Sequence, residues 1–130
     1  MLSTLEEVIQ RLVASYDPDR IILFGSYAAG RADQGSDIDL LVVKETELRQ
    51  IDRQIEVERL LSDRSIPLDV RVYTPREVLG FYAAGNPLIE EVVEKGRVLY
   101  MRKETAGRLA DAQEERDTAS ILLEARRDGT

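Results

Sequence analysis

The sequence contains no cysteine, no histidine and no tryptophan. Without cysteine there can be no disulfide, no thiolate nucleophile and no thiolate-bound metal, and without histidine there is no imidazole base and no histidine-ligated zinc. Catalysis by Ser-His-Asp or Cys-His groups is therefore excluded. Any catalytic chemistry must rely on carboxylates, lysine, tyrosine, hydroxyls or bound cations, and carboxylate oxygens favour hard cations such as Mg²⁺.

Long apolar runs and an excess of positive charge are also missing. No run approaches the roughly 18 apolar residues of a membrane-spanning helix, and Glu6 and Glu7 lie where a signal peptide would be basic and then apolar. We therefore expect a soluble, cytoplasmic protein with no membrane partner. The 18 Lys and Arg residues against 25 Asp and Glu residues give a net charge of −7, which disfavours bulk binding to nucleic acid.

The length and the apolar content predict one folded catalytic unit. The chain has 130 residues, of which 43% are hydrophobic, enough for the core of a single domain. The composition shifts at Lys103 toward charged residues and alanine. We expect a domain over residues 1–102 and a helical extension over 103–130 that packs loosely or contacts a partner.

Local patterns predict a mixed α/β fold. Ser3 and Glu6 form a capping-box pattern that begins a helix reaching toward Pro18, and Thr74-Pro75 and Asn86-Pro87 have the N-cap and first-turn proline of two later helices. A further helix is expected over 47–63, with Leu48, Ile51, Ile55, Leu60 and Leu61 as its apolar positions. Short apolar or alternating runs predict strands over 20–25, 38–43, 66–73 and 97–101.

The most informative segment has the pattern G-S-x10-D-x-D, from Gly25-Ser26 to Asp37-Ile-Asp39. Because strand side chains alternate, Asp37 and Asp39 project from one face, roughly 7 Å apart at ~3.3 Å per residue. Two unpaired carboxylates there would repel each other, so one or two Mg²⁺ ions would supply the counter-charge. Asp69 adds a third carboxylate if its strand lies beside that of Asp39; otherwise it is a solvated residue or a partner of Arg71.

The glycine and serine of this pattern suit an anion. Gly25 allows a tight turn after the first strand, and Ser26 offers a hydroxyl and backbone N–H groups where a helix begins. An anion site beside a cation site fits a nucleoside triphosphate, whose phosphates Mg²⁺ bridges to carboxylates. Either half of the pattern alone is common in turns, so the prediction depends on both. Arg31 either contacts a phosphate or faces solvent.

The segments 23–31 (LFGSYAAGR) and 35–42 (GSDIDLLV) resemble the signature of the DNA polymerase β-type nucleotidyltransferases, and the chain looks like a minimal nucleotidyltransferase of the MNT antitoxin type. The resemblance covers about residues 1–102. It implies a small mixed β-sheet flanked by helices, with Gly25 and Ser26 on the triphosphate of ATP, Asp37 and Asp39 on two Mg²⁺ ions, and Asp69 as third metal ligand and base. Family members often have arginine where this chain has Ala29.

The resemblance also implies a function and a partner. MNT antitoxins work beside HEPN-domain RNase toxins, which implies transfer of AMP from ATP to a toxin hydroxyl, in particular a tyrosine, within a homo- or hetero-oligomer. Two alternatives stay open. The same chemistry could act on a small hydroxylated molecule such as an aminoglycoside, although this chain shows no second substrate domain. The protein could instead neutralise its toxin by binding alone, with carboxylates that are not catalytic.

Overall fold

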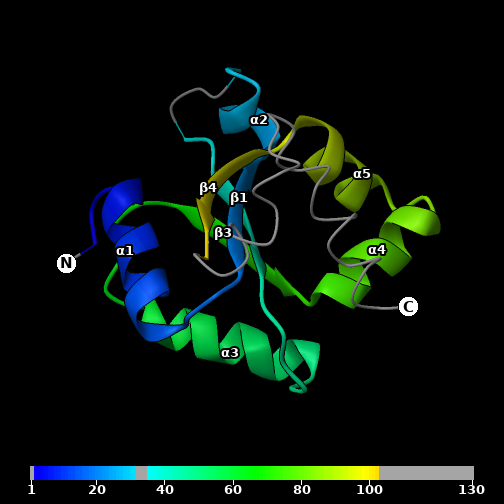
Figure 1. The fold of residues 1–130 in the computed structure, drawn as a ribbon. Coiled ribbons are helices and arrows are strands. Elements are labelled where there is room, and N and C mark those ends of the chain that lie inside the picture. Colours follow the sequence, from blue (N-terminus) through cyan, green and yellow to red (C-terminus); the bar gives the residue numbers. More distant parts are fainter. Residues whose placement is uncertain (1, 32–34, 103–130) are drawn as a thin grey trace.

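In a computed structural model that describes residues 2–31 and 35–102, helices cover both faces of one β-sheet (Figure 1). The helices are α1 (Leu5–Ser15), α2 (Gly25–Ala28), α3 (Gln50–Leu60), α4 (Pro75–Ala83) and α5 (Pro87–Lys95), and the strands are β1 (Arg20–Phe24), β2 (Ile38–Val43), β3 (Leu68–Tyr73) and β4 (Arg97–Met101). These elements confirm the predicted mixed α/β fold. The helix expected within 103–130 lies outside the described residues.

The sheet has four strands in the order β3-β2-β1-β4. Strands β2 and β3 are parallel, with α3 connecting them, whereas β1 is antiparallel to both β2 and β4. All five residues of β1 are buried, as expected for a strand with a neighbour on each side and helices on both faces. The sheet therefore holds the ends of β1, β2 and β3 in fixed register, and this register positions the site described below.

Two apolar clusters fill the two sides of the sheet. One includes Leu12 of α1 and Val57 of α3 and packs against the β-sheet face that carries Leu40. The other includes Ile89 and Val92 of α5 and packs against the opposite face. In Figure 1, α1 and α3 lie on one side of the sheet, α4 and α5 on the other, and α2 at one end. This arrangement matches the alternation of side chains along each strand.

The cap of the first helix differs by one residue from the prediction. The N-cap is Thr4, whose hydroxyl accepts from the Glu7 N–H while the Glu7 carboxylate accepts from the Thr4 N–H. Ser3 and Glu6 therefore do not form the capping box, although the Ser3 N–H also donates to Glu7. The two later caps are confirmed, since Thr74 and Asn86 accept hydrogen bonds at the starts of α4 and α5.

The predicted apolar face of the helix at 47–63 was wrong in part. Helix α3 starts at Gln50 rather than Glu47, and Leu48, Ile51 and Ile55 are exposed. Arg53 and Val57 are the buried residues of α3, and Leu61 is buried just after its end. The buried residues Arg53, Val57 and Leu61 are four positions apart and lie on one face of the helix, and one of them is charged. A search for apolar residues alone does not identify this face.

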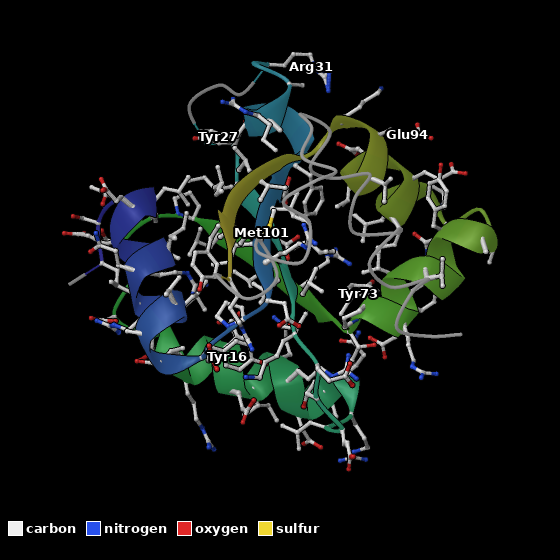
Figure 2. The ribbon with its side chains drawn as sticks, viewed as in Figure 1. Tyr16, Tyr27, Arg31, Tyr73, Glu94 and Met101 are labelled. Carbon is white, nitrogen blue, oxygen red and sulfur yellow. The ribbon has the colours of Figure 1, made fainter. Side chains whose placement is uncertain are left out.

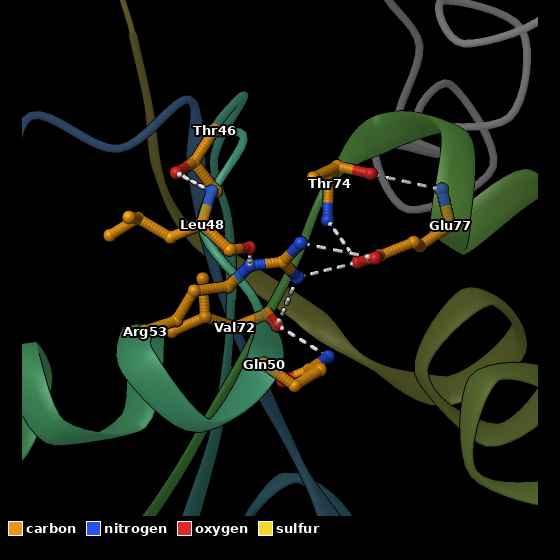
Figure 3. A network of polar contacts seen from close by, with 7 residues as sticks. All are labelled: Thr46, Leu48, Gln50, Arg53, Val72, Thr74 and Glu77. Carbon is orange, nitrogen blue, oxygen red and sulfur yellow. Dashed lines mark hydrogen bonds and ion pairs between the residues drawn. The ribbon is translucent and has the colours of Figure 1, made fainter.

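Arg53 is accommodated in this core by the Glu77 carboxylate and two backbone carbonyls (Figure 3). Its guanidinium makes two hydrogen bonds to the Glu77 carboxylate, at 2.7 and 3.1 Å, and donates to the carbonyls of Leu48 and Val72. The Glu77 carboxylate also accepts from the Thr74 N–H that begins α4. These bonds join the start of α3, the end of β3 and the start of α4, and the charge of Arg53 is paired with that of Glu77.

None of the helices within residues 2–31 and 35–102 has the length and the apolar character of a membrane-spanning helix.

Candidate active site

Two of the predicted carboxylates are brought together by the parallel strand pair. Asp39 of β2 is the register partner of Asp69 of β3, and neighbouring strands lie about 4.8 Å apart. Residues paired in a parallel ladder project from the same face of the sheet. The condition set for Asp69, that the third strand lies beside the second, is therefore met.

Asp37 lies just before β2, outside the strand, and is exposed. Partial burial raises the pKa of Asp39, and the negative charges of Asp69 and Asp37 raise it further, while Arg71 opposes them. The charges of Asp69 and Asp37 thus both act on Asp39. A cation bound among them would relieve this repulsion.

Arg71 supplies a counter-charge within the protein itself. It lies two residues after Asp69 on β3, and its guanidinium is 3.5 Å from the Asp69 carboxylate. The side chains of Arg71 and Asp69 are 47% and 42% exposed, so this ion pair is solvated and weak. The sequence left a pairing of Asp69 with Arg71 open as an alternative, and in the structure this ion pair coexists with the register pairing of Asp69 and Asp39.

The carboxylates suit a hard cation in their donor atoms. Asp39 and Asp69 present oxygen ligands from adjacent strands, and Asp37 is near enough to affect the titration of Asp39. Across residues 2–31 and 35–102, however, no three acidic side chains are already arranged around a single metal position. Metal binding by Asp37, Asp39 and Asp69 therefore stays a prediction.

The Gly25–Ser26 turn lies against the Asp39 carboxylate. Gly25 has a positive φ of 78° and follows Phe24, the register partner of Asp39. A Cβ atom at Gly25 would overlap the Asp39 carboxylate, so only glycine fits here. Helix α2 begins at Gly25, as predicted for the chain around Ser26. The turn and the acidic pair thus form one continuous site.

A pocket of about 260 Å³ opens beside this turn, between α2 and α5. Its lining residues are Gly25, Ala29, Arg31, Glu91 and Lys95. Figure 2 shows Arg31 at the end of the molecule where α2 lies. Two cationic side chains, one carboxylate and the small Ala29 therefore surround the glycine expected to bind phosphate.

Glu91 was not predicted as a site residue. Its carboxylate accepts a hydrogen bond of 3.1 Å from the Gly25 N–H, across 66 residues of sequence. In sequence it has the ordinary pattern of an acidic residue on an amphipathic helix, beside the buried Val92. No local signal could have identified this contact, since it depends on how α5 packs on β1.

Comparisons with known proteins agree with this geometry. The family model "Polymerase beta, Nucleotidyltransferase" matches residues 6–105. A putative protein adenylyltransferase of Methanocaldococcus jannaschii is 32% identical over 105 residues, covering 75% of this chain and 70% of the relative.

Two solved structures are similar in fold. A toxin–antitoxin structure with AMP-PNP is 25% identical with a TM-score of 0.56, over 95% of this chain and 86% of the other. A mutant MntA-HpeT toxin–antitoxin structure is 22% identical with a TM-score of 0.58, over 95% of this chain and 84% of the other.

Proposed function

The chain belongs to the polymerase β nucleotidyltransferase family, and we propose that it is an Mg²⁺-dependent protein adenylyltransferase that moves AMP from ATP to a partner protein. The proposed acceptor is a hydroxyl group, in particular a tyrosine, of a HEPN-type RNase toxin, so that the protein acts as an antitoxin. The observation that carries the proposal is the contact between the Gly25 turn and Asp39, beside the in-register Asp69. It supports the proposal because the turn that would bind phosphate lies beside the paired carboxylates.

The reaction assigns a role to each group. The acceptor oxygen bonds to the α-phosphorus of ATP, the bond from that phosphorus to the bridging oxygen breaks, and pyrophosphate leaves with the electron pair. In this proposal Asp69 takes the hydroxyl proton, and the Gly25–Ser26 turn holds the phosphates. Mg²⁺ held by Asp37, Asp39 and Asp69 would neutralise phosphate charge and lower the pKa of the attacking hydroxyl.

Two relatives support a protein acceptor over a small molecule. The matched relative from Methanocaldococcus jannaschii is described as a putative protein adenylyltransferase. A toxin–antitoxin structure with AMP-PNP shares the fold over most of this chain. The substrate of this chain, its partner and the residue modified in that partner are parts of our proposal.

A labelling experiment tests the proposal. The protein encoded beside this one is incubated with α-labelled ATP and Mg²⁺, with the wild-type chain or with the double variant Asp37→Ala, Asp39→Ala. Asp52→Ala is the matched control, because Asp52 lies on α3, which packs on the opposite face of the sheet. We expect label in the partner with wild type and with the control, and none with the double variant.

The other outcomes separate the two alternatives. A stable, silenced complex without label would favour neutralisation by binding alone. Label that enters an aminoglycoside-type acceptor but no protein would favour a small-molecule enzyme. Intact mass of the labelled partner counts the nucleotides added, and peptide mapping identifies the modified side chain.

A further inference from the structure

Helix α2 lacks a cap from its own neighbouring residues. Its N-cap residue is Phe24, which has no side-chain oxygen to accept from the first N–H groups of the helix. Such groups need an acceptor when water does not reach them. The Gly25 N–H finds this acceptor in Glu91 of α5, in a partly buried hydrogen bond. A carboxylate from a distant helix therefore completes the start of α2.

Glu91 is held in place by the packing of α5 on β1. Its neighbour Val92 is fully buried with Ile22 of β1 in the same cluster. At the end of α5, a Cβ on Gly96 would overlap both the Val92 carbonyl and the Ile22 side chain, so the helix end and the strand are in close contact. The position of the Glu91 backbone is thus fixed relative to β1, the strand that leads into Gly25.

The position of Gly25 in turn affects Asp39 and Ser26. Its Cα lies so close to the Asp39 carboxylate that no side chain fits between them. The next residue is Ser26, which follows Gly25 in the first turn of α2. A shift of Gly25 would therefore move the serine relative to the aspartate that it must work beside.

We propose that Glu91 is a positioning residue for nucleotide binding: by accepting the Gly25 N–H, it holds the Gly25–Ser26 turn at the distance from Asp39 that a Mg²⁺-bound triphosphate requires. This inference rests on the proposed function for its nucleotide. Lys95 and Arg31 line the same pocket, and their positive charges offset that of Glu91 where phosphate approaches. Glu91 acts through the backbone of Gly25 and is not itself a reacting group.

Two substitutions separate the hydrogen bond from the charge. Glu91→Gln keeps an acceptor oxygen of the same reach, whereas Glu91→Ala removes it. Glu90→Ala is the control, because Glu90 is an exposed acid on the same helix and its loss changes the net charge equally. Each variant is measured for thermal unfolding, for exchange of the Gly25 amide by NMR in the ligand-free protein, and for binding of ATP with Mg²⁺ by calorimetry.

We expect Glu91→Ala to exchange the Gly25 amide faster and to bind Mg²⁺-ATP about tenfold more weakly, as for loss of one hydrogen bond. Glu91→Gln should restore both properties, and Glu90→Ala should match wild type. Wild-type affinity in Glu91→Ala, or equal weakening in Glu91→Gln, would overturn the positioning role. If wild type itself bound no Mg²⁺-ATP, the proposed function would fail, and Gly25 exchange would still decide whether Glu91 holds the turn.

Discussion

Asp39 and Asp69 are register partners in the parallel pair of β2 and β3, so two carboxylates lie side by side on one face of the sheet. Like charges directly opposite each other destabilise a sheet. Burial and these charges raise the pKa of Asp39, which shows that the fold disfavours its charged form. The pair therefore costs stability in the ligand-free protein, and a cation bound to it would remove this cost.

Replacing one of these carboxylates should stabilise the metal-free protein. We expect Asp39→Asn to raise the free energy of unfolding in EDTA at neutral pH, by up to about 1 kcal/mol, because it removes the repulsion across the strand pair. The same change should abolish any stabilisation by Mg²⁺. Urea unfolding with and without Mg²⁺ measures both effects. A variant that is less stable than wild type in EDTA would contradict this account.

Nucleotide binding should depend on the metal. The ATP triphosphate would meet three aspartates, so we expect ATP to raise the melting temperature only when Mg²⁺ is present. Thermal unfolding is compared in ATP with Mg²⁺, ATP with EDTA, and Mg²⁺ alone. An equal increase in EDTA would show that the phosphates do not lie beside these carboxylates.

The glycine of the turn allows a matched comparison of two substitutions. Gly25 and Gly30 both have positive φ, 78° and 74°, but only Gly25 lies against another side chain. Alanine at Gly30 should cost only about 1 kcal/mol of backbone strain. Alanine at Gly25 should cost more and should also eliminate Mg²⁺-ATP binding, because its Cβ overlaps the Asp39 carboxylate. Equal effects on binding would argue against a nucleotide site at Gly25.

The Arg53–Glu77 pair predicts a specific dependence of stability on pH. Burial acts to raise the pKa of Glu77, but hydrogen bonds from Arg53 and the Thr74 N–H outweigh it and hold that pKa below its ordinary value. A depressed pKa means that the pair stabilises the fold fully above the pKa of an unfolded glutamate, about 4.3. This contribution is lost as pH falls through the lower pKa of the folded state.

The substitution Glu77→Gln checks this contribution. It should reduce the free energy of unfolding at pH 7 by about 2 kcal/mol. The reason is that the Arg53 side chain, which is only 6% exposed, would lose its negatively charged partner. The difference from wild type should shrink in acid. Glu58→Gln is the control, because the Glu58 side chain pairs with Arg64 while 51% exposed and should matter little. If the difference in stability between wild type and Glu77→Gln stayed the same at acid pH, it would not come from the charge of Glu77.

The exposed face of α3 gives a further comparison. Ile51 is 57% exposed and Val57 is fully buried. Ile51→Gln should change stability by less than about 0.5 kcal/mol, whereas Val57→Ala should cost about 2 kcal/mol, because it leaves a cavity between α3 and the sheet. Chemical unfolding measures the change in the free energy of unfolding for both variants. A large effect at Ile51 would mean that this face is covered in solution.

What could be predicted from sequence was set by local interactions. The helices that start at Pro75 and Pro87 were predicted correctly because Thr74 and Asn86 cap their own first turns. The pattern placed Gly25 near Asp39 because Gly25 follows β1 and Asp39 lies in β2, the neighbouring strand. The binding roles of Gly25, Asp37 and Asp39 stay predictions. The pairing of Asp39 with Asp69 could be stated only as a condition, since strand order is not visible in a single sequence.

What could not be predicted depends on contacts between distant segments. Arg53 is buried because Glu77, 24 residues later, neutralises it, so the buried face of α3 contradicted its apolar pattern. Glu91 reaches Gly25 only because α5 packs on β1. In both cases a charged residue with an ordinary surface pattern acquires its role from a partner that folding supplies.

The position of β4 has a consequence for synthesis of the chain. Strand β1 lies between β2 and β4, and β4 is formed by residues 97–101, so β1 has a neighbour on only one side until those residues leave the ribosome. Until then a strand whose residues are all buried in the finished sheet has open backbone groups along one edge, a form that joins readily to other chains. We therefore expect the nascent protein to stay prone to aggregation until β4 pairs with β1.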